Sequence, residues 1–492
     1  MITVGVSMVL RPINLVGSII LARLLDPSDF GAIALAMVLI GILRLFSRLG
    51  MGAALIHSRL DRSKIAFQSF VVTVLLGSLL FLLAVASAGP MAVLLGNPEI
   101  APILRWLFVL ILLDNLAVVP YSLLRKELMF GRVARMVVVS QLIQLSVALS
   151  LALMGYGLWS LVFSQLIGAF VRTLLVWILC PGWDWLIPKR WDAVVMKGLL
   201  GYGLQSSASG LVAYFQSHWD DWLVGSALGT AALGFYSRAF EFTNRTVRQL
   251  GHNVISAVFF PSYAKMQDDK ERLVRAYLKS VQLILLIMVP VSFGILVLAP
   301  QLVAIVLGEK WFPMLPTLQI FALMILTRAI SANTSSLFMA VGRPYYNLRA
   351  GLVLIVLMVP LALLLLDRGT IGVAIAVVVA DIAGVAYNIY QANSILPGTA
   401  AKTLTAILLG VLTGVPMLLG VQFLKPLVFQ MFGGGHNVIA LLSLVSMGGI
   451  IYVLTSLITQ RVLIGEILRL IVSVFESRFP LVRHIAEWRA NA

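Results

Sequence analysis

Arginines recur at helical spacing inside apolar stretches of this sequence. Arg44 and Arg48 are four residues apart, and Arg238, Arg245 and Arg248 follow one another at intervals of seven and three. Residues three, four or seven apart share one face of an α-helix, so each group presents a row of guanidinium groups. A guanidinium binds phosphate or carboxylate through charge-assisted, often paired, hydrogen bonds. The chemistry that these residues could perform is therefore anion binding.

The composition places these arginines in a membrane protein. Of the 492 residues, 60% are hydrophobic and 11% are charged, and the mean hydropathy is +1.01. Apolar runs long enough to cross about 30 Å of hydrocarbon recur along the whole chain. The sequence predicts an all-α polytopic membrane protein with about 14 transmembrane helices. Their approximate cores are 2–22, 31–55, 66–89, 102–124, 134–154, 158–180, 198–224, 231–260, 277–299, 314–341, 346–366, 370–392, 402–424 and 437–460.

Basic residues outside the spans indicate the topology. The net charge is +16, and most of the 36 lysines and arginines fall in segments on one side of the predicted membrane. By the positive-inside rule that side is the cytoplasm, and both termini are expected there. No cleaved signal peptide is expected, because the first methionine stands almost at the start of the first span. The tail 461–492 is interpreted as an amphipathic helix on the cytoplasmic surface, with a plain cytoplasmic tail as an equal alternative.

An internal repeat organises the predicted spans. The turn "ARLLDPSDFGAIALA" from Ala22 is echoed by "GSALGTAALGFYSRA" from Gly225, at an offset of 203 residues. Two further weak echoes, "LGNPE" with "LGEKW" and "YGLWSLV" with "TIGVAIA", follow in order at similar offsets. Because six spans per copy is an even number, the copies share one orientation and are related by a pseudo-two-fold axis along the membrane normal. The predicted domains are two six-helix bundles, 1–197 and 198–395, two additional helices in 396–460, and the tail 461–492.

The arginines inside predicted spans need partners that lipid does not supply. An arginine at the bilayer centre costs at least about 2.5 kcal/mol, so these side chains must face water or protein. A purely structural ion pair is an alternative for each of them, favoured most for Arg172 and Arg328. Taken as a set, they outnumber the acidic residues of the spans, which predicts a cationic central cavity that an anionic ligand visits. The eight are Arg11, Arg44, Arg48, Arg172, Arg238, Arg245, Arg248 and Arg328.

Candidate site residues follow from this reasoning. Asp220, Asp221 and Glu241 are candidate coupling or ion-pair carboxylates, and the ion-pair role is favoured over the carriage of protons or sodium ions. Asp114 and Asp381 are the other acidic residues of the spans, and no site role is assigned to them. The predicted substrate-binding residues of the cavity are Arg11, Arg44, Arg48, Arg238, Arg245, Arg248 and Arg328.

The sequence lacks the usual motifs of catalysis and cofactor binding. Cys180 is the only cysteine, which excludes an internal disulfide and a cysteine-rich metal site. No D-x-D, P-loop or H-E-x-x-H motif occurs. We therefore expect a protein that is not an enzyme, with no cofactor and no metal. Topology accounts for most of the positive charge, so no nucleic-acid partner is expected.

Five segments carry a resemblance to a known family: "LARLLDPSDFGAIALAMV", "GYGLWSLV", "DDWLVGSALGTAALGFYSRAFEF", "FPSYAKMQDDKERLVRAYLKSV" and "LGEKWFPMLPTLQIFAL". On these segments the chain resembles polysaccharide flippases of the multidrug/oligosaccharidyl-lipid/polysaccharide exporter superfamily. The resemblance implies two six-helix bundles that rock about a cationic cavity in alternating access. By position, the related lipid II flippases point to Arg11, Arg48 and one of Arg245 or Arg248.

The resemblance also implies a substrate and a location. The expected function is translocation of undecaprenyl-pyrophosphate-linked oligosaccharide repeat units from the cytoplasmic to the outer leaflet of the bacterial inner membrane, for O-antigen or exopolysaccharide biosynthesis. The expected partners are this lipid-linked substrate, the bilayer, and as candidates a polysaccharide polymerase and assembly proteins. Sugar identity, coupling ion and oligomeric state stay open.

Two other functions are weighed against the flippase. A drug/cation antiporter on a related fold should have an acidic cavity and 12 spans, and the sequence favours neither feature. A membrane-embedded oligosaccharide polymerase or glycosyltransferase should have a large outer loop with catalytic residues, whereas the predicted outer loops are short.

Overall fold

Helices form all the regular secondary structure in the described part of the chain. The computed structural model describes residues 2–58, 60–246, 253–433, 437–461, 463 and 465. Eleven helical segments among these residues are long and apolar enough to cross a membrane. A spanning segment must satisfy its backbone N–H and C=O groups internally, which a helix does by itself. The predicted all-α polytopic fold is confirmed.

The eleven segments are α2 (Pro27–Arg48), α4 (Arg62–Ala86), Pro98–Lys126 with α6 (Ala101–Leu107) and α7 (Val109–Lys126), α8 (Phe130–Leu153), α9 (Leu158–Leu179), α13 (Lys270–Val306), Glu309–Ala340 with α14 (Leu315–Ala340), α15 (Tyr345–Leu364), Leu366–Ile395 with α16 (Gly369–Ile395), α17 (Thr399–Phe432) and α18 (Val438–Thr459).

Three further predicted spans coincide with helices outside these eleven segments. The first span lies in α1 (Ile2–Leu24), and the seventh lies in the 36-residue α10 (Ala193–Leu228), which carries a row of polar residues. The eighth, predicted as one stretch over 231–260, is described as α11 (Thr230–Thr246) and α12 (Asn253–Lys265). The residues between these two helices lie outside the described part. Together with the eleven segments, these helices account for the positions of all 14 predicted spans.

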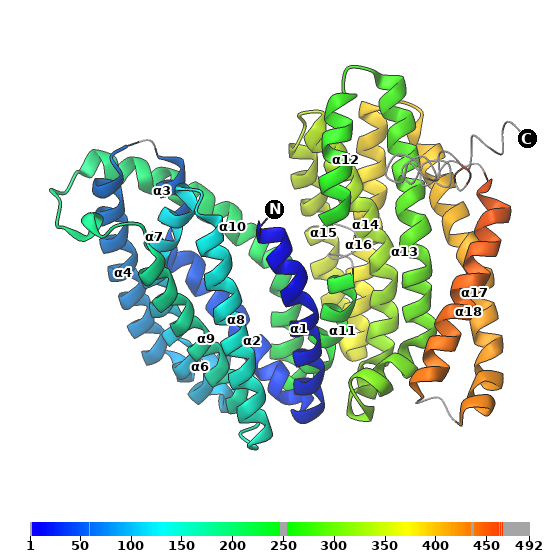
Figure 1. Ribbon diagram of the computed structural model, residues 1–492, viewed down its shortest axis with the longest axis horizontal. Helices are drawn as coiled ribbons and strands as arrows, with labels where there is room; N and C mark the ends of the chain where they lie inside the picture. The colour runs from blue at the N-terminus through cyan, green and yellow to red at the C-terminus, as the bar shows by residue number, and fades with distance from the viewer. Residues whose placement is uncertain are drawn as a thin grey trace, which may run out of the picture. The chain divides into compact units, whose positions relative to one another are not determined.

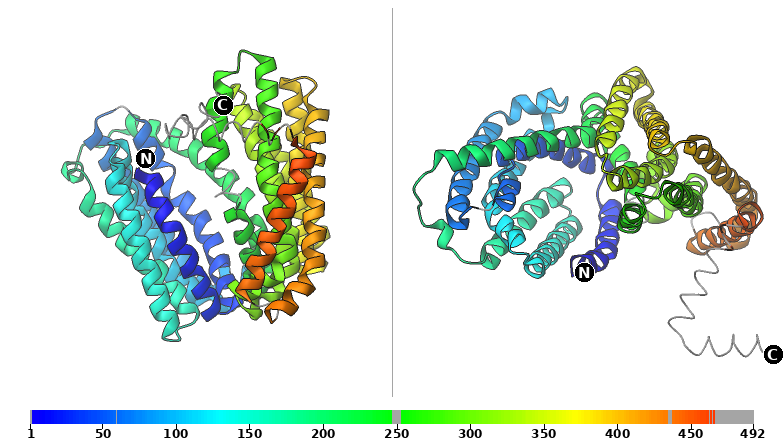
Figure 2. Two further views of the ribbon diagram at one scale, coloured as in Figure 1. Left: turned by 45° about the vertical axis from the view of Figure 1, so that its right-hand side comes forward. Right: turned by 90° about the horizontal axis from the view of Figure 1, so that it is seen from above.

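Packing divides the chain into two compact units. Unit 1 consists of Met1–Arg238 and Val306–Pro313, and unit 2 consists of Ala239–Ile305 and Met314–Ala492. In unit 1, α8 packs on α1 and α9, and α10 packs on α2 and on α3 (Met51–His57). In unit 2, α16 packs on α14 and α15, and α17 packs on α18 (Figure 1; Figure 2 shows the helices along their axes).

The repeat-based domain boundaries stay predictions, because packing alone does not identify a repeat. The helix α10, which the repeat assigns to the second bundle, packs within unit 1. The tail from 461 lies outside the described residues except at three positions, so its predicted amphipathic helix also stays a prediction.

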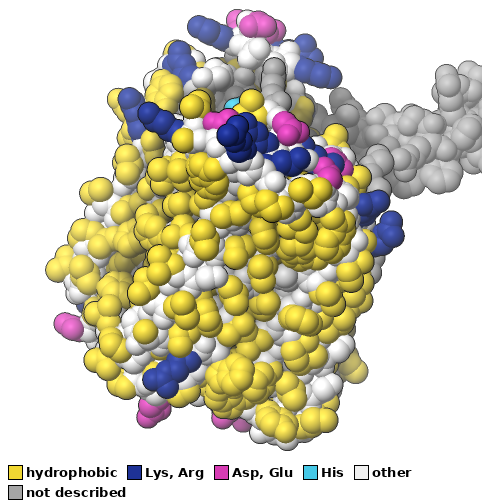
Figure 3. Space-filling model, turned by 90° about the vertical axis from the view of Figure 1, so that its left-hand side faces the viewer, with side chains coloured by type: hydrophobic (Ala, Val, Ile, Leu, Met, Phe, Trp, Pro, Cys, Tyr) yellow, Lys and Arg dark blue, Asp and Glu magenta, His cyan; other side chains and the backbone are white. Residues whose placement is uncertain are grey.

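One face of the molecule carries a broad apolar band. Figure 3 shows hydrophobic side chains over most of this face, with lysines and arginines gathered mainly beyond one end of the band. On α4, for example, the side chains of Leu75 and Leu82 are 66% and 63% exposed. Large apolar side chains left exposed over the length of a helix are what contact with lipid tails requires.

The starts of α2 and α11 cross at two glycines that are 203 residues apart. A Cβ atom on Gly31 would lie 1.7 Å from the carbonyl oxygen of Thr230, and one on Gly234 would lie 1.8 Å from that of Pro27. Thr230 is itself 203 residues after Pro27. The contact is therefore reciprocal, as contacts across a two-fold axis are. Only glycine permits this approach of the two backbones.

Two loops of unit 1 form a second reciprocal contact. The side-chain amide of Asn97 donates to the carbonyl of Gly225 at 3.0 Å, near the end of α10. The indole of Trp311 donates to the carbonyl of Ala22 at 2.8 Å, near the end of α1. Ala22 and Gly225 are again 203 residues apart. Each loop thereby satisfies a carbonyl in the last turn of a helix, a group that has no intrahelical partner.

Candidate functional site: a cationic cavity in unit 1

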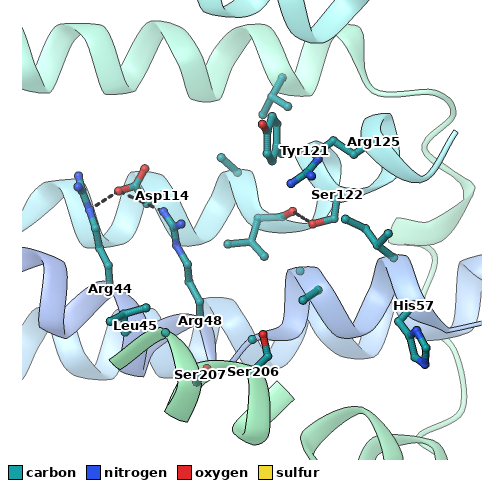
Figure 4. A pocket seen from close by; sticks show the side chains of 18 of the residues that line it. Arg44, Leu45, Arg48, His57, Asp114, Tyr121, Ser122, Arg125, Ser206 and Ser207 are labelled. Carbon is teal, nitrogen blue, oxygen red and sulfur yellow. Dashed lines mark hydrogen bonds and ion pairs between the residues drawn. The ribbon is translucent and has the colours of Figure 1, made fainter. Parts of the chain in front are cut away.

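A cavity of about 1000 Å³ lies among the helices of unit 1. Its walls come from α2, α3, α7, α8, α9 and α10. Figure 4 shows that charged side chains from α2 and α7 meet at one part of this cavity. The lining contains four arginines and one carboxylate, so the described walls carry a positive remainder. The charged lining residues are Arg44, Arg48, Arg125, Arg172 and Asp114.

Asp114 is the centre of the charged cluster. Its side chain is 4% exposed and lies in the second turn of α7, near the middle of the segment Pro98–Lys126. One oxygen, Oδ1, accepts a hydrogen bond from Arg172 Nη2 of α9 at 2.5 Å. The other oxygen, Oδ2, is 2.6 Å from Arg44 Nε and 3.5 Å from Arg48 Nη2, both on α2. Three guanidinium groups from two helices therefore share one buried carboxylate.

The pairing on the α2 side of the cluster is incomplete. Arg44 Nε lies close to Asp114 Oδ2, but neither atom takes part in a well-directed hydrogen bond. The Nε atom of Arg48 is buried and has no hydrogen-bond partner among the described residues. Buried donors without acceptors are costly in a low-dielectric interior. An anion in the cavity could reach these donors only after the arginine side chains turn toward it.

A break between α2 and α3 shapes the cavity floor. Leu49 and Gly50 adopt left-handed backbone conformations, with φ of 41° and 63°. Gly203 of α10 closes against this break, because a Cβ atom there would lie 2.2 Å from the carbonyl oxygen of Leu49. Non-helical backbone within a membrane span is tolerated where it is covered by protein or lines a polar cavity. The predicted continuous span 31–55 is thus two helices separated at the cavity.

The α10 wall of the cavity is polar and aromatic. Tyr202, Ser206 and Ser207 line it, and the ring of Tyr202 stacks on His57 at a centroid distance of 4.6 Å and an angle of 4°. Further along α10, the hydroxyl of Tyr214 donates to the backbone carbonyls of Met37 and Val38 of α2. This wall holds hydroxyl groups and ring faces beside the cationic cluster.

Three predicted site residues of unit 1, Asp220, Asp221 and Arg238, lie outside the cavity lining. The guanidinium of Arg238 lies 3.9 Å from the ring centroid of Phe30, a cation–π contact. Asp220 is buried and accepts a hydrogen bond from the hydroxyl of Tyr236 at 2.8 Å. The roles of these residues stay predictions.

The predicted residues of unit 2 are in close pairs. Arg245 Nη2 is 2.5 Å from Glu241 Oε1, one helical turn away, which is the pairing that the sequence spacing predicts. Arg328 Nε lies 3.2 Å from Asp381 Oδ2, and its Nη1 donates to Asn244 at 3.3 Å. The Arg328 guanidinium also lies 4.9 Å from the ring centroid of Phe240.

Two of the predicted arginines cannot be placed in the site. Arg248 and the side chain of Arg11 lie outside the described residues. Conversely, the sequence assigns no site role to Asp114, and it leaves Arg172 out of the predicted substrate-binding residues because it favours the structural alternative there. A signal for Asp114 was present, because a carboxylate in a membrane span requires a cationic partner. The identity of that partner depends on how α7, α2 and α9 pack, which residue spacing does not give.

Solved structures with this fold define its class. The lipid II flippase MurJ in an inward closed conformation superimposes with a TM-score of 0.74 at 16% identity, covering 94% of this chain and 99% of that one. An inward-facing multidrug resistance MATE transporter of the MOP superfamily gives a TM-score of 0.62 at 19% identity, covering 78% and 94%. The chain therefore shares its fold with these two membrane transporters.

The sequence assigns the family within that fold. Residues 20–316 match the family of polysaccharide biosynthesis proteins, and the chain belongs to this family. The succinoglycan biosynthesis transport protein ExoT of Rhizobium meliloti is 28% identical over 307 residues, 62% of this chain and 61% of ExoT. The lipopolysaccharide biosynthesis protein WzxC of Escherichia coli is 24% identical over 358 residues, 68% of each chain. The matched part thus spans less than two thirds of ExoT.

Proposed function

We propose that this protein is a flippase for lipid-linked oligosaccharides in the synthesis of a surface polysaccharide. It moves undecaprenyl-pyrophosphate-linked repeat units from the cytoplasmic to the outer leaflet of the bacterial inner membrane. The observation that carries the proposal is the cavity in unit 1, whose described lining holds four arginines and one carboxylate. Membership of the polysaccharide biosynthesis family and the transport names of relatives such as ExoT support the same reading.

The cavity chemistry fits a pyrophosphate head group. Arginine binds phosphate oxygens in pairs, and it holds its charge at any physiological pH. The side chain of Arg48 is 42% exposed, so its guanidinium is available to a ligand. The hydroxyl groups and the ring of Tyr202 on α10 offer partners for the adjoining sugar. A drug/cation antiporter would instead need a cavity that attracts cations, which this positive remainder repels.

Transport in the proposed direction requires that the cavity open first to the cytoplasmic side and then to the outer side. With both termini in the cytoplasm, the head group enters from that side and leaves into the outer leaflet. An inside-negative potential favours outward movement of an anion by about 2.3 kcal/mol per charge per 100 mV. An ionised pyrophosphate therefore moves downhill electrically. A polysaccharide polymerase that consumes the product on the outer side is the proposed downstream partner.

A flipping assay in proteoliposomes tests the proposal. A fluorescent polyprenyl-pyrophosphate oligosaccharide is placed in both leaflets, and a membrane-impermeant reductant reports the fraction that reaches the outside. We expect flipping by the native chain and a severe loss with Arg48→Ala at matched reconstitution. The control is Arg275→Ala, which removes an arginine that is 70% exposed and paired with Glu271 on α13. Flipping that is absent from the native chain, or unchanged in Arg48→Ala, would contradict the proposal.

A further inference from the structure

Among the described residues that line the cavity, Asp114 is the one that carries a carboxylate. We propose that Asp114 competes with the substrate head group for the same arginines. While the cavity is empty, the carboxylate holds the arginine side chains in place. When the pyrophosphate is bound, the carboxylate lowers its affinity for the arginines, which speeds release. This inference rests on the proposed function. It assigns to Asp114 a positioning role through the arginines, with no direct contact to the substrate.

The burial and contacts of Asp114 support the role of a resident anion. The side chain is 4% exposed, although its three arginine partners are 23% to 42% exposed. Substrate can therefore reach the guanidinium groups from the cavity while the carboxylate stays behind them. Without Asp114, three cations would face one another in a region of low dielectric, which is strongly unfavourable.

The three arginines are not held equally. Arg172 makes a well-directed hydrogen bond of 2.5 Å to Oδ1, so it anchors the carboxylate. Arg44 and Arg48 share Oδ2, and Arg48 is the more distant of the two, at 3.5 Å. The buried Nε of Arg48 has no hydrogen-bond partner among the described residues. We expect Arg48 to turn to the phosphate first, with Arg44 second and Arg172 remaining on Asp114.

Competition of this kind suits a transporter. A pyrophosphate bound beside Asp114 shares its arginines with another anion, and the two negative groups repel each other. Binding of the ligand and pairing by Asp114 are therefore coupled negatively. A site that conducts its substrate must bind strongly enough to admit it and weakly enough to release it. Removing the carboxylate should tighten binding and slow transport, an unusual combination for loss of a buried charge.

A matched control exists in unit 2. Asp381 is also buried in a span, with its side chain 8% exposed, and it pairs with Arg328 at 3.2 Å. Asp381 does not line the cavity of unit 1. The substitution Asp381→Asn therefore removes a comparable buried charge from a comparable pair. A general effect of losing such a charge should appear in both variants, whereas competition with the ligand should appear only in Asp114→Asn.

The experiment measures binding and stability of the full-length protein in nanodiscs. The probe is farnesyl pyrophosphate, and farnesol is the uncharged control. We expect Asp114→Asn to bind the pyrophosphate about tenfold more tightly than the native chain, within the usual range of coupling between sites. Its unliganded form should melt at a lower temperature than native, and the probe should raise that temperature by more. Asp381→Asn should melt lower than native with unchanged affinity.

A second pair of variants covers the case in which Asp114→Asn alone does not fold. Arg172→Gln removes one cation, and Arg172→Gln with Asp114→Asn restores the native charge balance of the cluster. The double variant should bind the probe more tightly than Arg172→Gln alone.

The possible outcomes separate this inference from the proposed function. If the native chain binds farnesyl pyrophosphate but the removal of Asp114 leaves affinity equal or weaker, Asp114 is structural only and the flippase proposal stands. Binding by neither chain overturns the proposed function together with the inference. If Asp114→Asn binds the probe more tightly but flips substrate faster than native at saturating substrate, the inference is also overturned. Competition predicts that the variant releases its substrate more slowly.

Discussion

Two clusters of buried charge, one in each unit, combine arginine and aspartate in opposite proportions. In unit 1 one aspartate, Asp114, is shared by three arginines beside a cavity. In unit 2 one arginine, Arg328, has an aspartate, an asparagine and an aromatic ring as partners. The first cluster has more cation than anion, and the second is balanced. From this contrast we expect that an arginine in a membrane span is available to a ligand only where the surrounding partners do not balance its charge.

The helices that carry the two clusters are related by order in the chain. Asp114 and Arg172 are on α7 and α9, and Arg328 and Asp381 are on α14 and α16, so each pair joins the fourth and sixth predicted spans of its half. The acidic and basic members have exchanged places between the halves. An ion pair is as stable in either orientation, so the exchange preserves a link between these two helices. What differs is the addition of Arg44 and Arg48, which only the first cluster has among the described residues.

The largest expected effect on thermal stability comes from breaking the balanced cluster of unit 2. Arg328→Ala leaves Asp381 buried without its cation, and removal of one partner from a buried pair costs about 3 to 5 kcal/mol. We expect a clear fall in the thermal unfolding midpoint of the purified protein, measured by tryptophan fluorescence. Arg328→Met combined with Asp381→Leu removes both charges and should recover most of the loss.

The same variant can also break the comparison between the two clusters. A native unfolding midpoint in Arg328→Ala, accompanied by lost flipping, would return Arg328 to the substrate-binding set that the sequence predicts. A double variant that keeps its stability and still flips would confirm that this cluster serves the fold alone.

A smaller effect is expected from an exchange that keeps the charge at the cavity. Arg48→Lys retains a cation but loses the planar fork that binds two oxygens at once. The loss of one charge-assisted hydrogen bond, about 1.5 kcal/mol, corresponds to roughly tenfold weaker binding of farnesyl pyrophosphate. The unfolding midpoint should stay near native. Equal binding by the lysine variant would show that the cavity attracts the anion by charge alone, without bidentate contacts.

The sequence predicts more of the fold than of the site. Apolar runs mark the spans because a helix in lipid needs a long apolar surface, and the eleven membrane-crossing segments coincide with predicted spans. The spacing of Arg44 and Arg48 correctly predicts that both side chains point the same way from one helix. The hydropathy of α10 and α11 is lowered by polar residues, yet their predicted spans coincide with helices.

The partners across helices could not be predicted. Asp114 and Arg172 are 58 positions apart and meet because α7 packs on α9 in one register. A shift of one helical turn would separate them without changing any sequence pattern. The break at Leu49 and Gly50 was also missed, since an apolar run continues through it. The glycine at position 50 was a signal, because glycine adopts left-handed backbone conformations without strain.

Removing a third charged pair, which lies outside the spans, should have the smallest effect on the unfolding midpoint. Asp192 accepts hydrogen bonds from the backbone N–H groups of Val194 and Val195, which caps the start of α10, and its Oδ2 is 2.7 Å from Lys64 Nζ of α4. The hydrogen bond from Lys64, followed by those from the backbone, lowers the pKa of the Asp192 carboxyl. A lowered folded-state pKa means that the carboxylate stabilises the fold at pH values above its ordinary pKa. That contribution is lost as pH falls through the folded-state value.

The lowered pKa of Asp192 determines how the effect of its removal on the unfolding midpoint should change with pH. Asp192→Ala should lower the unfolding midpoint slightly at pH 7, and the difference from native should shrink in acid below the ordinary aspartate range. High salt should reduce it as well, because this partly exposed pair is screened more than the Asp114 and Asp381 clusters. Asp192→Asn keeps an acceptor for the helix cap but not the charge, so it should lie between alanine and native. A large, salt-independent loss in Asp192→Ala would place this exposed pair with the buried clusters and weaken the distinction between charges that bind ligand and charges that only hold helices.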